Sequence, residues 1–513
     1  MSIATLPQTL EEAHAVIEQL QWRVRQLEKQ VYGPTSDRAL STETISKEQI
    51  LFSLFPPPAE PPATSEVAVE GLPATPEALR SRHPARTLTP RVLETVIQRI
   101  EPEEKLCPHC GKTKCEIGCE KSERFEYIPA KIIRHEIVRP KLACPCGQGK
   151  VSIAPLPPTP VEKGYPGPGL IAQVMLAKYD DHLPLYRQEQ QFARLGVNFP
   201  RQMLCDWVEH GARWLQPIVR QMKSELLAGD YLQVDETPVK VMDPEVKGKC
   251  ATGYLWLAGR PGGDVVFEFH PGRGKEYAKE LLGDFSGYLQ RDGYGVYGAL
   301  VKDYPGRFKP CGCMAHFRRK LVEGLEAQPK EAEWLVIEMR KLYLIERHAR
   351  DEGMNAEQRH ALRHQLTPPI LSGIKARMDE LRPGLLPQSP LGKAVSYGVA
   401  EWDALNRYLE DGRLEIDNNL TENALRPSCV GKKNYLFFGH PQAGWRSAVI
   451  YSVIVSCRRR KIDPWEYLRD LMQRLPAAKN HEIPDLVPAR WEALQNSRRL
   501  NSLASRSDFP HGV

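Results

Sequence analysis

The sequence lacks the long apolar runs of membrane proteins. No stretch of its 513 residues approaches the roughly 20 consecutive apolar residues that a membrane span needs. The N-terminus, Met1 to Leu10, also lacks the basic segment and apolar run of an export signal. With 41% hydrophobic and 26% charged residues, the composition is typical of a soluble globular protein. We therefore expect a cytoplasmic protein with no membrane partner, and its length predicts several domains.

The twelve cysteines are not distributed as in a disulfide-rich secreted chain. Six of them cluster between Cys107 and Cys146, where two close pairs are separated by 33 residues and each pair is followed by glycine. Two such thiolate pairs can complete a tetrahedral Zn²⁺ shell. Residues 101–150 are therefore predicted to form a zinc-ribbon-like domain with a structural Zn²⁺ ion bound by Cys107, Cys110, Cys144 and Cys146. Cys115, Cys119 and His109 leave the ligand choice open, and reduced cysteines without metal are the alternative.

Charge is unevenly distributed along the chain. Residues 1–80 contain 6 basic and 11 acidic side chains, a net charge of −5, whereas residues 426–513 contain 15 and 7, a net charge of +8. A basic C-terminal region, taken as residues 456–513, fits a position near nucleic acid. A solvated basic surface would explain the charge equally well.

The N-terminal 100 residues divide into two segments. Apolar residues from Leu10 to Val31 alternate spacings of three and four, which predicts a short coiled coil within residues 1–40. An amphipathic helix docked on its own domain is the alternative. Residues 41–100 contain the runs Pro56–Pro58 and Pro61–Pro62 with little apolar periodicity, which predicts an extended linker.

Residues 165–225 have helical periodicity, with one helix over Tyr186–Leu195, a turn at Gly196 and a second helix after Pro200. Helix, glycine turn and helix predict a helix-turn-helix, in which Arg201 and Gln202 would contact DNA. An ordinary helical hairpin has the same pattern.

From residue 231 the chain changes to short β-rich runs, and helical patterns then dominate from about His316 to Glu410. This order predicts a multidomain α/β protein, whose catalytic core at residues 231–455 carries a helical insertion at about 316–410. The predicted strands are Tyr231–Val234, Gly253–Gly259, Val265–Phe269 and Gly287–Arg291.

Three acidic residues are candidate metal ligands. Asp235 and Asp292 each follow an apolar run, which predicts that they lie at strand ends, and Glu422 lies on a helix that Asn418 or Asn419 would cap. Clustered carboxylates suit Mg²⁺ ions that activate and stabilise the oxygens of a phosphodiester. Taken singly, Asp235 could cap a turn and Glu422 could be a surface residue.

Several short motifs lie around the three acids, at Val234–Pro238, Arg291–Tyr294, Asp417–Glu422 and Gly431–Gly439, with Leu183–Gln188 upstream. Together these segments resemble the insertion sequence 66 family of transposases. The resemblance covers nearly the whole chain, including the order of leucine-zipper segment, cysteine pairs and acids. It implies a ribonuclease H-like core in which Asp235, Asp292 and Glu422 are the DDE ligands, and it is the main reason for preferring Glu422 over Glu415.

The same resemblance implies a function. Such an enzyme cleaves transposon ends and joins them to target DNA, using Mg²⁺ or Mn²⁺. It acts as a homo-oligomer in the bacterial cytoplasm, associated with the nucleoid when bound to DNA, and often with small accessory proteins. A zinc-containing DNA-binding regulator without catalysis and a ribonuclease H-like nuclease that only hydrolyses are the rival functions.

Further residues acquire expected roles from their position. Cys313 and His316 resemble a Cys-x-x-His signature of several transposase groups, and we expect His316 to support the active site rather than bind metal. Arg426, Lys432 and Lys433 follow Glu422 and are suited to holding phosphates, although a solvated basic loop is the alternative. Departures from the family pattern are Asn423, His440 and the basic run Arg458–Lys461, none of which removes a DDE carboxylate.

Overall fold

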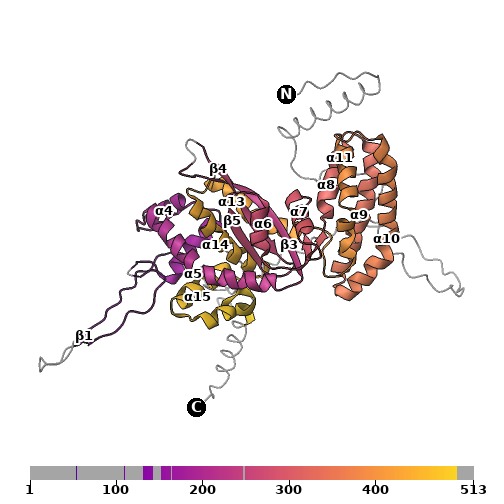
Figure 1. Ribbon diagram of the computed structural model, residues 1–513. Helices are drawn as coiled ribbons and strands as arrows, with labels where there is room; N and C mark the ends of the chain where they lie inside the picture. The colour runs from indigo at the N-terminus through magenta and orange to yellow at the C-terminus, as the bar shows by residue number, and fades with distance from the viewer. Residues whose placement is uncertain are drawn as a thin grey trace, which may run out of the picture. The chain divides into compact units, whose positions relative to one another are not determined.

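The computed structural model describes residues 54, 109, 131–142, 152–162, 164–245 and 249–493 (Figure 1). The chain divides into two compact units, and residues 57–135 form the smaller one. The fold below is that of residues 136–493 in the larger unit. The predicted coiled coil, the linker apart from Leu54, and the zinc ligands Cys107, Cys110, Cys144 and Cys146 lie outside the described residues. No helix in the described part of the chain is long and apolar enough to cross a membrane.

The predicted pair of helices is present before the sheet. A two-residue ladder, β1 (Lys141–Leu142) with β2 (Ser152–Ile153), precedes helices α3 (Pro168–Tyr179), α4 (Leu185–Arg194) and α5 (Arg201–Leu227). Gly196 has a φ of 84°, a left-handed conformation that favours glycine and ends α4. Phe199 then packs against Phe192 and Trp207, with ring centroids 5.4 and 5.0 Å apart. These contacts fix the turn between the two helices.

A mixed five-stranded sheet follows. Its strands are β3 (Tyr231–Val241), β4 (Ala251–Gly259), β5 (Val265–His270), β6 (Gly287–Gln290) and β7 (Phe308–Cys311). Their order is β5-β4-β3-β6-β7, with β3, β4 and β5 antiparallel and β6 and β7 parallel to β3. Helix α6 (Lys275–Leu282) connects β5 to β6, and α7 (Gly295–Asp303) connects β6 to β7. The chain is therefore a mixed α/β protein, and β7 is a strand that the sequence did not predict.

A buried helix covers the edge of the sheet at β5. Helices α13 (Asn419–Tyr435), α14 (Pro441–Arg459) and α15 (Pro464–Arg474) follow the insertion, with short 3-10 turns at Leu475–Ala477 and Asn480–Leu486. The hydroxyls of Ser456 and Ser452 in α14 accept the main-chain N–H groups of Val265 (3.0 Å) and Phe267 (2.8 Å). These bonds satisfy donors that an edge strand would otherwise expose.

The helical insertion lies between β7 and α13, close to the predicted range. It contains α8 (Met314–Leu325), α9 (Pro329–Asp351), α10 (Ala356–Leu381), α11 (Pro390–Ala400) and α12 (Trp402–Asn406), with 3-10 turns at Arg382–Gly384 and Arg407–Leu409. Helices α8 to α11 pack side by side as a bundle (Figure 1). Its core is apolar and includes Phe317, Leu335, Met339, Ile374, Met378 and Leu391. The same apolar cluster includes Tyr231 of β3 and Cys311 of β7, so the insertion packs against the sheet through a shared core.

Candidate functional site

Asp235 lies in the middle of β3, so its predicted place at a strand end is wrong. The strand continues for six residues beyond it, to Val241. The apolar run does stop at Val234, but β4 supplies pairing partners along the whole segment, including Leu257 opposite Asp235. Cross-strand pairing therefore extends β3 through residues whose own pattern does not predict a strand. Asp235 is consequently held in the pairing of β3 with β4, whereas the pairing of β3 with β6 ends at Gln233.

The side chain of Asp235 shares a face of β3 with two residues that contact α13. Successive strand side chains point to opposite faces, so Gln233, Asp235 and Thr237 lie on one face. Gln233 accepts a hydrogen bond from the hydroxyl of Thr421 at 2.8 Å, and Thr237 accepts one from Lys432 at 3.1 Å. The face of β3 that carries Asp235 is therefore the face covered by α13.

Glu236 points to the opposite face and was missed by the sequence reasoning. Its carboxylate accepts a hydrogen bond from Tyr297 of α7 at 2.9 Å and forms an ion pair with Arg273. The Arg273 guanidinium stacks over the ring of Tyr294, 3.7 Å from its centroid. In the sequence, only the position of Glu236 directly after Asp235 could have pointed to its ion pair with Arg273. Glu236 is thus engaged with partners on the side of β3 away from α13.

Asp292 follows a strand, as predicted. Strand β6 ends at Gln290, and the Asp292 carboxylate accepts the main-chain N–H of Tyr294 at 2.9 Å. Gly293 is required here by packing, because a Cβ at this position would lie 2.3 Å from the ring of Tyr397. Since β6 runs parallel to β3 and beside it, Asp292 and Asp235 belong to neighbouring strands.

Glu422 lies in the first turn of α13, which begins at Asn419. Asn418 occupies the N-cap position, but its side chain makes no capping bond, so the predicted capping by this side chain is wrong. Its amide instead donates to the Val234 carbonyl at 2.9 Å, while Asp417 accepts the Asn419 N–H at 3.0 Å. Asn418 therefore attaches the start of α13 to β3, one residue before Asp235.

Three buried polar side chains of the sheet hold the segment that leads into α13. The hydroxyl of Tyr231 accepts the Glu415 N–H at 3.0 Å, and Gln290 donates to the Glu415 carbonyl at 2.8 Å. Gln233 binds Thr421, as above, and also Gln290 at 2.7 Å. Buried polar groups that are satisfied in this way fix one arrangement, because an alternative would leave them unpaired. The position of Glu422 relative to the sheet is thereby determined.

The three acids interact electrostatically. Burial, which has the largest effect, and the charges of Glu236, Asp292 and Glu422 together raise the pKa of Asp235 to about 8, against the lowering effect of the hydrogen bond from the Glu236 N–H. An isolated carboxyl would be ionised far below neutral pH. A divalent cation would offset this mutual repulsion, and carboxylate oxygens are the ligands that Mg²⁺ and Mn²⁺ prefer. Carboxylate chemistry therefore suits such an ion, but among the described residues the ligand atoms that gather within 4.8 Å of one another belong to Cys313, His316 and Glu422, and not to Asp235 or Asp292.

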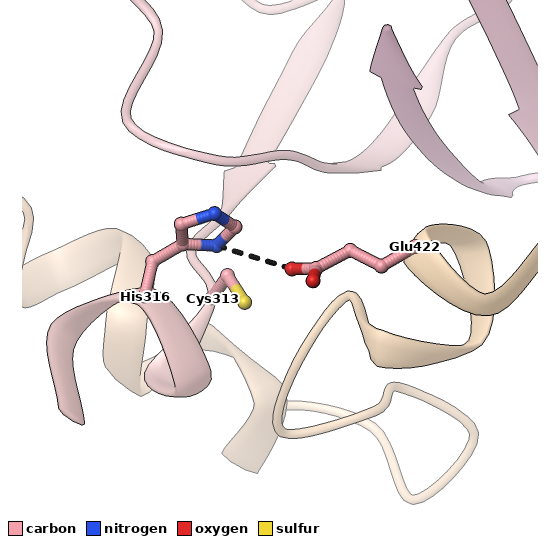
Figure 2. Close-up of side chains that lie close together, drawn as sticks. All are labelled: Cys313, His316 and Glu422. Atoms are coloured by element: carbon pink, nitrogen blue, oxygen red, sulfur yellow. Dashed lines mark ion pairs between the residues drawn. The ribbon is translucent and has the colours of Figure 1, made fainter. Parts of the chain in front are cut away.

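Cys313 and His316 lie beside Glu422 (Figure 2). Cys313 precedes α8 and His316 lies in its first turn, while Glu422 comes from α13. The His316 Nδ1 is 3.5 Å from the Glu422 Oε1, and one potential ligand atom from each of the three residues lies within 4.8 Å of the others. The structure thus places His316 in contact with the third acid.

The three predicted phosphate-binding residues of α13 differ in their surroundings. Arg426 and Lys433 are exposed. Lys432 is half-buried, and its ammonium donates to the Thr237 hydroxyl at 3.1 Å and the Pro238 carbonyl at 3.0 Å. Lys432 therefore joins α13 to β3, whereas the other two present their charges to solvent.

The basic run at the end of α14 is largely used within the protein. Arg458 pairs with Asp180 and Arg460 pairs with Asp264, each at 2.6 Å. Arg459 donates to the Arg260 carbonyl at 2.7 Å. The predicted domain boundary at 455/456 falls inside α14, so the structure does not separate the core from a basic region there.

Three other residues singled out by sequence lie at the starts of helices. His440, a departure from the family pattern, accepts the Gln442 N–H at 3.2 Å and so caps α14. Arg201 and Gln202 are exposed at the start of α5, where Gln202 donates to Asp206 at 3.0 Å.

Comparison with known proteins identifies the family. The model described as Transposase IS66 family matches residues 163–446, its zinc-finger domain matches residues 104–147, and its C-terminal element matches residues 452–489. The uncharacterized protein y4jD of Sinorhizobium fredii is 30% identical over 509 residues, which cover 96% of this chain and 98% of that protein. A second uncharacterized protein of the same organism, y4qI, is 32% identical over 417 residues, covering 77% of this chain and 75% of its own. With matches to the zinc-finger domain, the transposase model and the C-terminal element in that order, the chain belongs to the IS66 family of transposases.

Proposed function

We propose that the chain is a DDE transposase that cleaves transposon ends and transfers the strands into target DNA. Asp235, Asp292 and Glu422 would hold Mg²⁺ or Mn²⁺ in this site. The observation that supports the proposal most directly is the burial of Asp235 within β3, which raises the pKa of its carboxyl to about 8 with smaller contributions from the charges of Glu236, Asp292 and Glu422. Acidic residues that raise the pKa of a buried carboxyl suit a site for divalent cations, and the chain belongs to a family of transposases.

The divalent ions would activate the attacking oxygen and stabilise the leaving oxygen of the phosphodiester. The protein supplies a rigid frame for these ligands. Asp235 is fixed on a central strand, and Thr421 and Asn418 attach the first turn of α13 to the sheet. Arg426 and Lys433 would bind DNA phosphates, while Lys432 orients α13.

We also propose that the core is ribonuclease H-like. The mixed five-stranded sheet places one acid on its central strand, and the acid after β6 belongs to the neighbouring parallel strand. The helical insertion between β7 and α13 precedes the third acid, as the resemblance implies. This arrangement supports the proposal without depending on the zinc-finger domain.

Recognition of DNA ends would involve the α4–α5 pair, with Arg201 and Gln202, and the zinc-finger domain, with Cys107, Cys110, Cys144 and Cys146 as zinc ligands. The exposure of Arg201 and Gln202 supports this role. Assembly as a homo-oligomer through residues 1–40, and action with small accessory proteins, belong to the same proposal.

The test is a cleavage and joining assay with the full-length protein, DNA bearing the terminal inverted repeats of the element, Mg²⁺ and a target plasmid. Removal of a metal ligand costs several kcal/mol of transition-state stabilisation, so we expect Asp235→Asn to lower the cleavage rate at least about a thousandfold. Asp284→Asn, at an exposed carboxylate after α6, is the matched control and should retain wild-type activity. Unchanged cleavage by Asp235→Asn would overturn the proposal.

The products distinguish the rival functions. Cleavage followed by joining is the outcome expected of a transposase. Cleavage without joining would identify a nuclease, and specific end binding without cleavage would identify a DNA-binding regulator.

A further inference from the structure

Cys313, His316 and Glu422 together have the ligand types of a site for a metal ion softer than magnesium. Its three potential ligand atoms are a sulfur, an imidazole nitrogen and a carboxylate oxygen, all within 4.8 Å of one another (Figure 2). Cys313 is fully buried, while His316 and Glu422 are partly exposed. The group is therefore open to solvent on one side and closed at the sulfur.

Two polar atoms of this group lack hydrogen bonds to the described residues. The His316 Nδ1 and the Glu422 Oε1 are buried atoms, face each other at 3.5 Å and have no hydrogen-bond partner there. The second oxygen of Glu422 is directed to Arg319 instead, at 3.4 Å. Buried polar atoms without partners carry a desolvation cost that a bound cation would remove.

The backbone around the group favours anionic ligands. The Cys313 sulfur accepts the main-chain N–H of Asn418 at 3.3 Å. Cys313 immediately precedes α8, and Glu422 lies in the first turn of α13, so both stand at the positive end of a helix dipole. A thiolate, a carboxylate and a neutral imidazole would together balance the charge of one divalent ion.

We propose that Cys313, His316 and Glu422 form a Zn²⁺ site that is distinct from the Mg²⁺ site and competes with it. Sulfur and imidazole ligands favour zinc over magnesium, and three protein ligands leave a fourth position for water. Binding releases the thiol proton of Cys313 to solvent. Inhibition of the enzyme by this zinc ion rests on the proposed function, in which Glu422 is the third catalytic carboxylate. Zinc binding draws Glu422 towards α8 and so inhibits the enzyme.

Metal binding can be tested independently of catalysis. Full-length protein is titrated with Co²⁺, whose thiolate-to-metal absorption and bound equivalents are measured in wild type, Cys313→Ser and the control Cys311→Ser. Cys311 is also buried but is not among the three ligands, and both variants keep the cysteines of the zinc-finger domain. We expect Cys313→Ser alone to lose one equivalent of Co²⁺ per chain. Equal equivalents in wild type and Cys313→Ser would overturn the site.

Inhibition is tested by adding Zn²⁺ to the Mg²⁺-dependent cleavage assay and comparing each variant with its own zinc-free rate. Loss of a ligand should raise the half-inhibitory Zn²⁺ concentration at least about tenfold in Cys313→Ser, with no change in Cys311→Ser. His316→Gln is a second variant that should give the same relief if Cys313→Ser does not fold. An unaltered half-inhibitory concentration in a folded variant would overturn competition. A protein with no cleavage activity would contradict the proposed function, and the Co²⁺ titration would still decide the metal site.

Discussion

Buried carboxylates in two regions of the described chain differ in how their charges are compensated. In the helical insertion, Glu346 of α9 forms ion pairs with Arg363 at 2.7 Å and with Arg359 at 3.1 Å. In the core, burial raises the pKa of Asp235, and the charges of Glu236, Asp292 and Glu422 add to this effect. Both regions remove charge from water, but within the described residues Asp235 forms no ion pair, whereas its acidic neighbours Glu236 and Glu422 pair with Arg273 and Arg319.

The difference separates a structural cluster from a functional one. Arg363 also donates to the carbonyls of Tyr408 and Leu414, at 2.7 and 2.8 Å, so its charge is used to hold the chain that leads back to the core. In the part of the chain that the structure describes, no cationic side chain compensates Asp235, which suits a group that binds an external cation. The pairing of Glu346 with Arg363 thus indicates a structural role, whereas the unpaired Asp235 near other acids is a candidate ligand for a cation.

The largest effect is expected from breaking the compensated cluster. Glu346→Ala leaves the fully buried Arg363 without its anion, which costs about 3–5 kcal/mol in the free energy of unfolding. Glu380→Ala removes an exposed partner of Arg377 in the same bundle and should change stability by less than about 1 kcal/mol. Urea unfolding measures both variants. Similar losses in the two would show that Glu346 is no more structural than a surface acid.

Removal of Asp235 should have the opposite effect on stability to removal of Glu346, because the raised pKa of Asp235 makes the stability of the metal-free protein depend on pH. Because the folded-state pKa of Asp235 is about 8, the folded protein retains a proton that the unfolded chain loses above about pH 4. Stability without divalent metal should therefore fall as pH rises from about 4 to 8. Asp235→Asn should remove part of this dependence and stabilise the metal-free protein at pH 8 by about 1–3 kcal/mol.

Unfolding in EDTA at pH 5 and pH 8 measures this effect, with Asp284→Asn as the control. Mg²⁺ should stabilise wild type by binding to the folded state, and stabilise Asp235→Asn less. If wild type and Asp235→Asn showed the same pH dependence, the pKa of Asp235 would not be raised by its burial and its acidic neighbours as the structure indicates.

The smallest effect concerns two neighbouring lysines on α13. Lys432→Met removes the bonds to Thr237 and Pro238 and should cost about 1 kcal/mol in stability. Lys433→Met should leave stability within about 0.5 kcal/mol, but lower the salt dependence of DNA binding by about one unit of slope. Thermal unfolding and binding isotherms at several salt concentrations measure both. A loss of stability in Lys433→Met and a lower salt dependence of DNA binding in Lys432→Met would show that the two lysines have exchanged roles.

Local patterns predicted the helices and several strands well. The helix pair on either side of Gly196 is present, and strands β4 and β5 lie within two residues of their predicted bounds. Strand β3 is longer than predicted, because pairing with β4 stabilises residues after Asp235 that lack an apolar run. Strand β7 was missed because Phe308–Cys311 is too short and irregular to show alternation.

Side-chain roles were harder to predict than elements. Lys432 and Lys433 are adjacent and identical in type, yet only Lys432 contacts β3, which is 195 residues away along the chain. The run Arg458–Arg460 has the composition of a phosphate-binding patch, but its arginines contact Asp180, Asp264 and the Arg260 carbonyl. Charge alone does not reveal whether an internal partner is present.

The sequence by itself determined that this chain has three candidate acids in order, a helical insertion before the third, and motifs similar to one transposase family. Only the tertiary structure decided that Asp235 lies within a strand, that Glu422 contacts His316, and that Asn418 binds Val234. The physical reason is the range of the interactions. Helical and strand periodicity depends on neighbours a few residues away, whereas the bond from Asn418 to Val234 spans 184 residues and forms only when the sheet and α13 have packed.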